Sequence, residues 1–274
     1  TDLTCKACSP MNIQFGVDTY SMPKAGVRGL MNQGVKSFFF ITVEGAFGDT
    51  SFAAGKSFIE QAGGSVVGNV KHPLGTTDFS SYLLQAQASK AQAIVIVNAG
   101  ADQTNALKQA AEFRIARSGQ AVSVFGMTIN SVGAMGLDVA QGLQITAPFY
   151  WDLNDETRAW SKRFAAAHGG KYPSMDQAGV YAVVTHYLKA IDAAKTDDGT
   201  KIAAKMKEMP TDDPLFGKGT IRQDGRKIHP AYLFEVKKPS ESKGPYDYYK
   251  LRATIPADQA FRPLNEGDCP MIKK

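Results

Sequence analysis

Apolar and polar positions follow two alternating patterns over the first 150 residues. Short runs rich in Val, Ile and Phe predict strands, and longer stretches with apolar residues every three or four positions predict helices. The expected strands are 36–42, 65–71, 92–98, 122–128 and 142–149, and the expected helices are 21–33, 49–62, 78–90 and 102–115. Gly63 and Gly64 fit the end of one helix, and Asp102 fits the N-cap of another. This alternation predicts the α/β class, with a mostly parallel, doubly wound sheet covered by helices on both faces.

The pattern changes after residue 150, where three helices follow one another with no strand between them. They are expected at 155–167, 175–194 and 200–208. Ser174 with Gln177 three residues later is typical of a capping box at the second of these helices. Segments 219–222 and 227–236 then flank Gln223-Asp224-Gly225, where Asp-Gly predicts a hairpin turn, and 246–255 is one more strand candidate.

Composition narrows the classes of protein. Among the 274 residues, 43% are apolar, which is enough for a globular fold, and 31 Lys and Arg stand against 26 Asp and Glu. The basic residues are scattered, so a nucleic-acid surface is not expected. No apolar run is long enough to span a bilayer, so direct membrane insertion is not expected either. The opening Thr1-Asp2-Leu3-Thr4 has no signal-peptide pattern, so export cannot be recognised from this sequence directly.

All three cysteines lie near the ends of the chain. Cys5 and Cys8 have redox-motif spacing, but Ser9-Pro10 prevents the helix that would lower a thiol pKa, and a zinc site would need further ligands. We favour a disulfide between Cys8 and Cys269, which would join the two ends and indicate an oxidising compartment. Free buried thiols are the alternative.

Six strings, in this order, resemble one family. They are DTY at 18–20, EGAFGD at 44–49, HPLGTTDFSS at 72–81, LQAQASK at 84–90, APFYWDLNDET at 147–157 and DDPLFG at 212–217. Together they resemble the type I periplasmic solute-binding proteins of ABC transporters that serve branched-chain amino acids and aromatic acids. The order matches over essentially the whole chain.

The resemblance implies two lobes that close on a small ligand by a hinge. It places a crossover segment at 1–20, the second lobe at 21–146 and 229–251, part of the first lobe at 147–228 and a C-terminal tail at 252–274. Several βα units that relatives carry in the first lobe are not matched. It also implies a periplasmic location, a membrane permease of an ABC transporter as partner, and no cofactor.

The candidate ligand-binding residues come from a rule for parallel sheets and from the family resemblance. Ligands of open parallel sheets bind beyond the carboxyl ends of the strands, so the loops after the strands at 36–42, 92–98 and 122–128 should line one edge. The chosen residues are Glu44, Phe47, Ala99, Gly100, Asp102, Thr128 and Asn130, with Tyr20 and Tyr150 near the expected crossovers.

Each choice has a plain structural alternative. Phe47 matches a position where relatives place an aromatic ring over the ligand, and the alternative is that it packs in the core. Ala99 and Gly100 would let ligand approach the backbone, or simply form a tight turn. Asp102, Thr128 and Asn130 could contact ligand or cap helices. Tyr20 and Tyr150 could wall the pocket or fill the hinge.

No catalytic motif supports an enzyme. The chain has no G-x-S-x-G, no G-x-G-x-x-G after a strand, and four dispersed histidines without metal-ligand spacing, so neither a metal site nor catalysis is expected. A ligand-sensing regulatory domain on the same fold is the rival to a transport receptor. An amino-acid ligand would need a carboxylate such as Glu44 or Asp102 for its ammonium group, whereas an aromatic acid would need only an apolar wall and backbone N–H groups.

Overall fold

The computed structural model describes residues 2–272 and divides into two compact units. Unit 1 consists of Thr1–Asp18, Pro148–Pro230 and Pro256–Lys274, and unit 2 consists of Thr19–Ala147 and Ala231–Ile255. Residues 1, 273 and 274, which belong to the expected crossover and tail segments, lie outside the described part. We describe each unit by itself.

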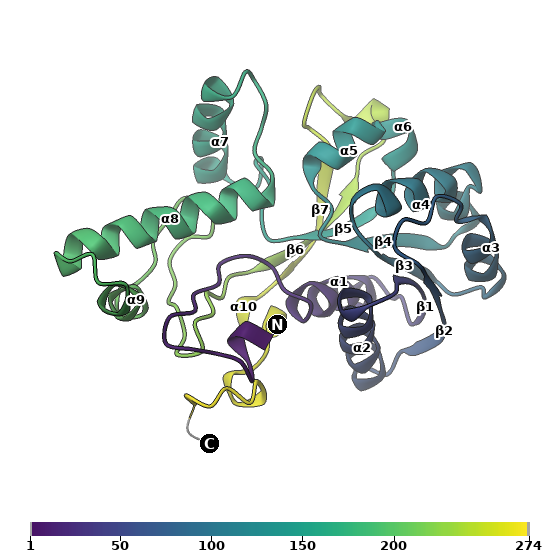
Figure 1. Ribbon diagram of the computed structural model, residues 1–274. Coiled ribbons are helices and arrows are strands. Elements are labelled where there is room, and N and C mark those ends of the chain that lie inside the picture. Colours follow the sequence, from purple (N-terminus) through teal and green to yellow (C-terminus); the bar gives the residue numbers. More distant parts are fainter. Residues whose placement is uncertain (1, 273–274) are drawn as a thin grey trace. The chain divides into compact units, whose positions relative to one another are not determined.

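Unit 2 is built on one seven-stranded sheet in the order β2-β1-β3-β4-β5-β6-β7 (Figure 1). The first five strands in this order pair in parallel, and β6 and β7 are added antiparallel at one side. The bounds are β1 Ser37–Val43, β2 Ser65–His72, β3 Ala93–Val97, β4 Ala121–Phe125, β5 Gln144–Ala147, β6 Ala231–Val236 and β7 Tyr249–Ile255. The expected α/β class with a mostly parallel sheet is confirmed.

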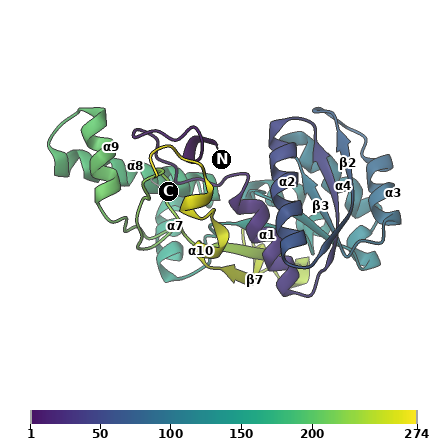
Figure 2. The same ribbon diagram turned by 90° about the horizontal axis from the view of Figure 1, so that it is seen from below.

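Helices cover both faces of this sheet because its central strand β3 is apolar throughout. All five residues of β3 are buried, so neither of its faces can be left to solvent. Helices α1 and α2 share one face and α3 and α4 the other (Figure 2). Gly26 and Gly29 let α1 lie close to the sheet, since a Cβ at Gly29 would lie 2.8 Å from the Leu233 side chain. The helices of this unit are α1 Ser21–Asn32, α2 Ala46–Gln61, α3 Ser80–Ala88, α4 Gly100–Glu112, α5 Ile129–Met135 and α6 Leu137–Ala140, with 3-10 turns η2 Ile115–Ser118 and η3 Pro239–Glu241.

Unit 1 is mainly helical, and its described residues contain isolated β-bridges but no strand. Its elements are η1 Asp2–Thr4, α7 Asp155–Ala167, α8 Met175–Ala194, α9 Gly199–Glu208, α10 Ala257–Ala260 and η4 Leu264–Glu266. Helix α8 packs against α7 through Ala178 and Trp160, and against α9 through Ala182, Ala190 and Ile202. The predicted run of three helices is confirmed.

One side of α8 is apolar but uncovered. Val180, Val184 and Leu188 follow one another at four-residue intervals, and their exposed fractions are 61%, 47% and 57%. Trp160 and Phe164 of α7 line the same groove, which has a volume of about 760 Å³. Large exposed apolar patches of this kind mark surfaces that another polypeptide or ligand covers.

Local signals were mostly reliable. Ser174 is the N-cap of α8, and it forms the predicted capping box with Gln177. The Asp-Gly turn is also present, with Gly225 at φ 85° and its N–H donating to Arg222 O at 2.9 Å. The predicted start of the strand at 227–236 is wrong, because β6 begins at Ala231. Pro230, which has no N–H to donate, directly precedes it.

The ends of unit 1 are joined covalently. Cys8 and Cys269 form the favoured disulfide, with their Cα atoms 5.6 Å apart, and Cys5 is a buried free thiol. Burial raises the pKa of the Cys5 thiol, so the protonated, unreactive form is favoured. None of the described helices has the length and apolar character needed to cross a bilayer.

Candidate ligand-binding site

The order of strands in unit 2 selects one position at the edge of the sheet. The chain leaves β1 for β2 on one side and then returns to β3 on the other side of β1. The loops after β1 and β3 therefore lead to helices on opposite faces, and a crevice opens between them at the carboxyl edge. The pairing of Thr42 with Val97 brings the ends of these two strands side by side.

The loop after β1 enters α2 through two glycines. Gly45 is the N-cap with φ 104° and ψ −179°, a conformation that favours glycine, and no side chain caps this end of the helix. A Cβ at Gly48 would lie 1.8 Å from Val43 O, so glycine is needed for α2 to begin this close to its own strand. The first N–H groups of α2 are thus left for solvent or a ligand.

Two candidate side chains stand on this loop. Phe47 lies in the first turn of α2 with 43% of its surface exposed, so it is not a core residue in unit 2. Glu44 is exposed and, within residues 2–272, makes no ion pair. The neighbouring carboxylate of Asp49 is occupied, since it accepts a hydrogen bond from Lys71 Nζ at 2.7 Å.

The loop after β3 enters α4 through Ala99 and Gly100. Ala99 is extended, Gly100 has φ 61°, both are exposed, and this helix also lacks a side-chain cap. The prediction of Asp102 as N-cap is wrong, because the helix begins at Gly100. The Asp102 side chain instead accepts a hydrogen bond from Gly75 N at 2.9 Å and is only 5% exposed, so it holds the loop after β2.

Sequence reasoning missed a buried polar pair beneath the crevice. His72 ends β2, is completely buried and contacts Pro73 O through Nδ1 at 2.9 Å. In the tautomer that donates from Nδ1 to Pro73 O, Nε2 accepts from Asn98 Nδ2, 3.4 Å away. Asn98 Oδ1 is then buried with no partner among the described residues. The available signal was a polar residue directly after the apolar run AIVIV.

Thr128 and Asn130 follow β4 at the same edge. Thr128 is the N-cap of α5, and its Oγ1 accepts from Ser131 N at 3.2 Å, so its hydroxyl has a structural role. Asn130 is exposed. The structure therefore brings Glu44, Phe47, Ala99, Gly100, Thr128 and Asn130 to one edge of unit 2, and it buries Asp102 there.

The two tyrosine candidates are buried in different units. Tyr20 in unit 2 packs edge-on against Phe58, with ring centroids 4.8 Å apart, and Lys24 Nζ lies 5.2 Å from the Tyr20 ring. Tyr150 in unit 1 is 5% exposed, and its ring lies 5.8 Å from that of Trp151. Each has a packing role within its own unit. No group of three or more His, Cys, Asp or Glu placed to hold a metal occurs within residues 2–272.

An open α/β sheet whose switch-point crevice is bordered by two helix N-termini without side-chain caps is typical of ligand-binding proteins. A family model described as periplasmic binding protein matches residues 1–245. The chain belongs to this family of periplasmic binding proteins.

Solved structures give the same result. A periplasmic binding protein from Burkholderia mallei is 44% identical over 99% of this chain and 72% of its own, with a TM-score of 0.90. A branched-chain amino acid ABC transporter periplasmic ligand-binding protein from Burkholderia xenovorans LB400 is 40% identical over 99% of this chain and 72% of its own, with a TM-score of 0.92.

A more distant structure shows the fold alone. An amino acid ABC transporter substrate-binding protein from Pseudomonas fluorescens Pf-5 is 24% identical over 98% of this chain and 72% of its own, with a TM-score of 0.89. No curated protein matches the chain. The family model and the two Burkholderia relatives confirm the expected family and favour a solute-binding protein over a regulatory domain.

Proposed function

We propose that the chain is the extracytoplasmic receptor of an ABC importer and binds a small carboxylate at the crevice between the loops after β1 and β3. The observation that carries this proposal is the meeting of two uncapped helix N-termini, those of α2 and α4, at the switch point of the sheet. The 40% identical relative, a branched-chain amino acid ABC transporter periplasmic ligand-binding protein, supports it.

The chemistry of the crevice favours an anionic group on the ligand. Unpaired N–H groups at a helix N-terminus carry a partial positive charge, which stabilises a carboxylate. Gly45 and Gly100 present bare backbone where a ligand carboxylate would approach, and the exposed Phe47 ring supplies apolar area beside it. The ligand class is therefore an amino acid or an organic acid with an apolar body.

Glu44 distinguishes these two ligands. Because Asp102 is already held by Gly75 N, Glu44 is the carboxylate left to receive an ammonium group. An amino acid that uses Glu44 should lose affinity in Glu44→Gln, whereas an aromatic or aliphatic acid should bind equally well or better.

Isothermal titration calorimetry tests the proposal by measuring the Kd for branched-chain amino acids, aromatic acids and short amides. Phe47→Ala should weaken the affinity for the bound class about 2- to 13-fold, since an aromatic contact contributes about 0.5–1.5 kcal/mol. Leu251→Ala is the matched control, because Leu251 is similarly exposed, at 49%, but lies on β7. No binding by any of these classes, or equal losses in both variants, would reject the crevice as the site.

The remaining parts of the proposal concern partners and location. We propose that the chain works in the periplasm after export, delivers its ligand to a membrane permease, and does so without catalysis or a cofactor. The two lobes and their hinge closure also stay a proposal, as does the assignment of 147–228 to part of a first lobe. The exposed apolar groove of α7 and α8 supports that assignment, because it provides a face for further polypeptide.

A further inference from the structure

A second cavity lies at the opposite edge of the unit 2 sheet. It opens where β4 and β5 begin and where the antiparallel β6 ends, under the last turn of α4, the 3-10 turn η2 and the short helix α6. Its volume is about 380 Å³, within the range of small-molecule sites. Because ligands of parallel sheets bind at the carboxyl edge, this cavity is separate from the crevice described above.

The floor of the cavity is apolar. Leu107 from α4, Val122 from β4 and Leu143 before β5 line it, and each is at most 4% exposed. These three side chains come from three different segments and are buried, so the floor is part of the folded core. Val139 on α6, which is half-buried, adds accessible apolar surface beside this floor. An apolar group can therefore be received there, but it finds no hydrogen bonds.

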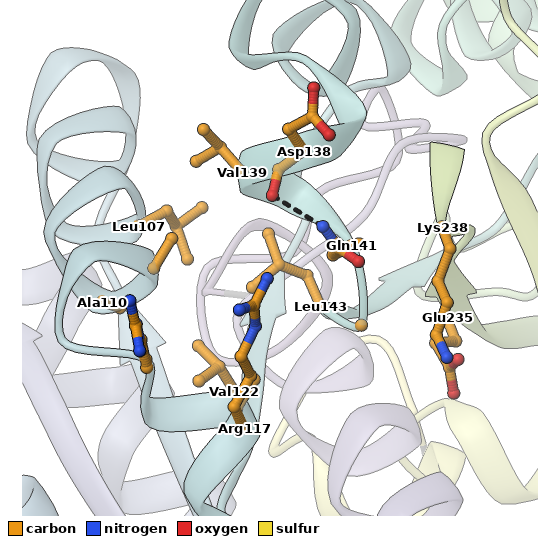
Figure 3. A pocket seen from close by; sticks show the side chains of 14 residues that line it. Leu107, Ala110, Arg117, Val122, Asp138, Val139, Gln141, Leu143, Glu235 and Lys238 are labelled. Carbon is orange, nitrogen blue, oxygen red and sulfur yellow. Dashed lines mark hydrogen bonds between the residues drawn. The ribbon is translucent and has the colours of Figure 1, made fainter. Parts of the chain in front are cut away.

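The rim carries three cationic side chains, Arg114, Arg117 and Lys238, all of them exposed. None of the three takes part in an ion pair within the described part of the chain. Figure 3 shows the Arg117 side chain rising into the middle of the pocket from η2, and Lys238 on the β6 side. The rim can therefore offer its positive charge to a bound anion.

Two acidic residues also line the cavity, but neither cancels this charge. Glu235 is already neutralised by Arg252 Nη2 at 2.8 Å and Lys250 Nζ at 3.3 Å. Asp138 lies on α6, and its carboxylate points away from Arg117 in Figure 3. The nearby dashed line is a hydrogen bond from Gln141 Nε2 to Asp138 backbone O, 2.8 Å long.

The local backbone holds the rim in place. Arg114 has φ 55°, a left-handed conformation that is uncommon for a residue other than glycine. It turns the chain sharply from α4 into η2, and Gly119 with φ 93° turns it again towards β4. The two turns bring Arg114 and Arg117 to the same rim.

We propose that this pocket binds an organic carboxylate with a short apolar body, independently of the crevice. The apolar body would lie against Val139, over the floor of Leu107, Val122 and Leu143. The carboxylate would accept hydrogen bonds from Arg117, with Arg114 or Lys238 adding charge. An arginine fork suits a carboxylate because it can donate two parallel hydrogen bonds.

The test is a titration of the ¹⁵N-labelled chain with hexanoate, followed by the amide resonances of Leu107, Arg117 and Leu143. We expect saturable shifts at these amides, and binding about tenfold weaker for hexanamide, which lacks the charge, and for inorganic phosphate, which lacks the apolar body. Shifts at Gly45 and Gly100 would report binding at the crevice separately.

Three variants complete the experiment. Arg117→Gln should raise the Kd for hexanoate about tenfold. Lys108→Gln removes the same charge from an exposed position of α4 outside the cavity, and Phe47→Ala alters only the crevice, so both should leave this Kd unchanged. The same spectra show whether each variant is folded. No saturable shift at the pocket amides, equal affinity for hexanamide, or equal effects of Arg117→Gln and Lys108→Gln would overturn the proposal.

Discussion

Removal of the Cys8–Cys269 disulfide is the perturbation whose magnitude the structure defines most directly. The bond closes a loop with a sequence separation of 261 residues. The chain-entropy relation for a loop of this length gives about 5.5 kcal/mol of stabilisation, and measured losses for native disulfides are typically about 2–5 kcal/mol. We therefore expect the double variant Cys8→Ala/Cys269→Ala to lose several kcal/mol.

Urea unfolding followed by tryptophan fluorescence measures this loss where it should occur. Both tryptophans, Trp151 and Trp160, lie in unit 1, which is also the unit that the disulfide closes. A loss of about 4 kcal/mol would lower the urea midpoint by about 2 M, for an m-value near 2 kcal/mol per M.

Cys5→Ala is the matched control, because Cys5 is a buried cysteine outside the disulfide. It should lower the midpoint much less than the double variant, and excess reductant should destabilise the Cys5→Ala protein but not the double variant. If Cys5→Ala and the double variant unfold at the same urea concentration, and reductant affects neither, the disulfide does not stabilise unit 1 and the argument fails.

Two further predictions concern unit 1. Burial lowers the pKa of His229 to about 4, from 6.5. As the pH falls, His229 therefore binds a proton in the unfolded chain before it does so in the folded chain. About 3 kcal/mol of stability should be lost between about pH 6.5 and about pH 4. The free energy of unfolding, measured at several pH values, should fall in this range for the native protein and for the exposed control His168→Gln, but not for His229→Gln. The same pH dependence in His229→Gln would contradict the assignment. On α8, replacing Val180 and Leu188 by lysine should leave the urea midpoint unchanged, since both side chains are more than half exposed. A lower midpoint would show that this face is already packed.

Local sequence determined most elements of this protein. The two periods of apolar residues located the sheet strands and the longer helices, but not the short helices α5, α6 and α10, because each period reflects which side of one element is buried. The capping box at Ser174 and the turn at Asp224-Gly225 were also predictable, since their hydrogen bonds join residues two to four positions apart. The disulfide remained one of two alternatives until the fold placed Cys8 beside Cys269.

Tertiary structure decided the sites. The crevice depends on β3 lying on the far side of β1 from β2, and strand order is not encoded in any local period. Asp102 fits a helix cap in sequence, but Gly75, 27 positions away, takes its carboxylate. The second pocket joins the end of α4 to the end of β6, residues more than 120 positions apart that meet only in the folded sheet. Contacts between distant segments depend on how whole elements pack, and so only the folded chain could show them.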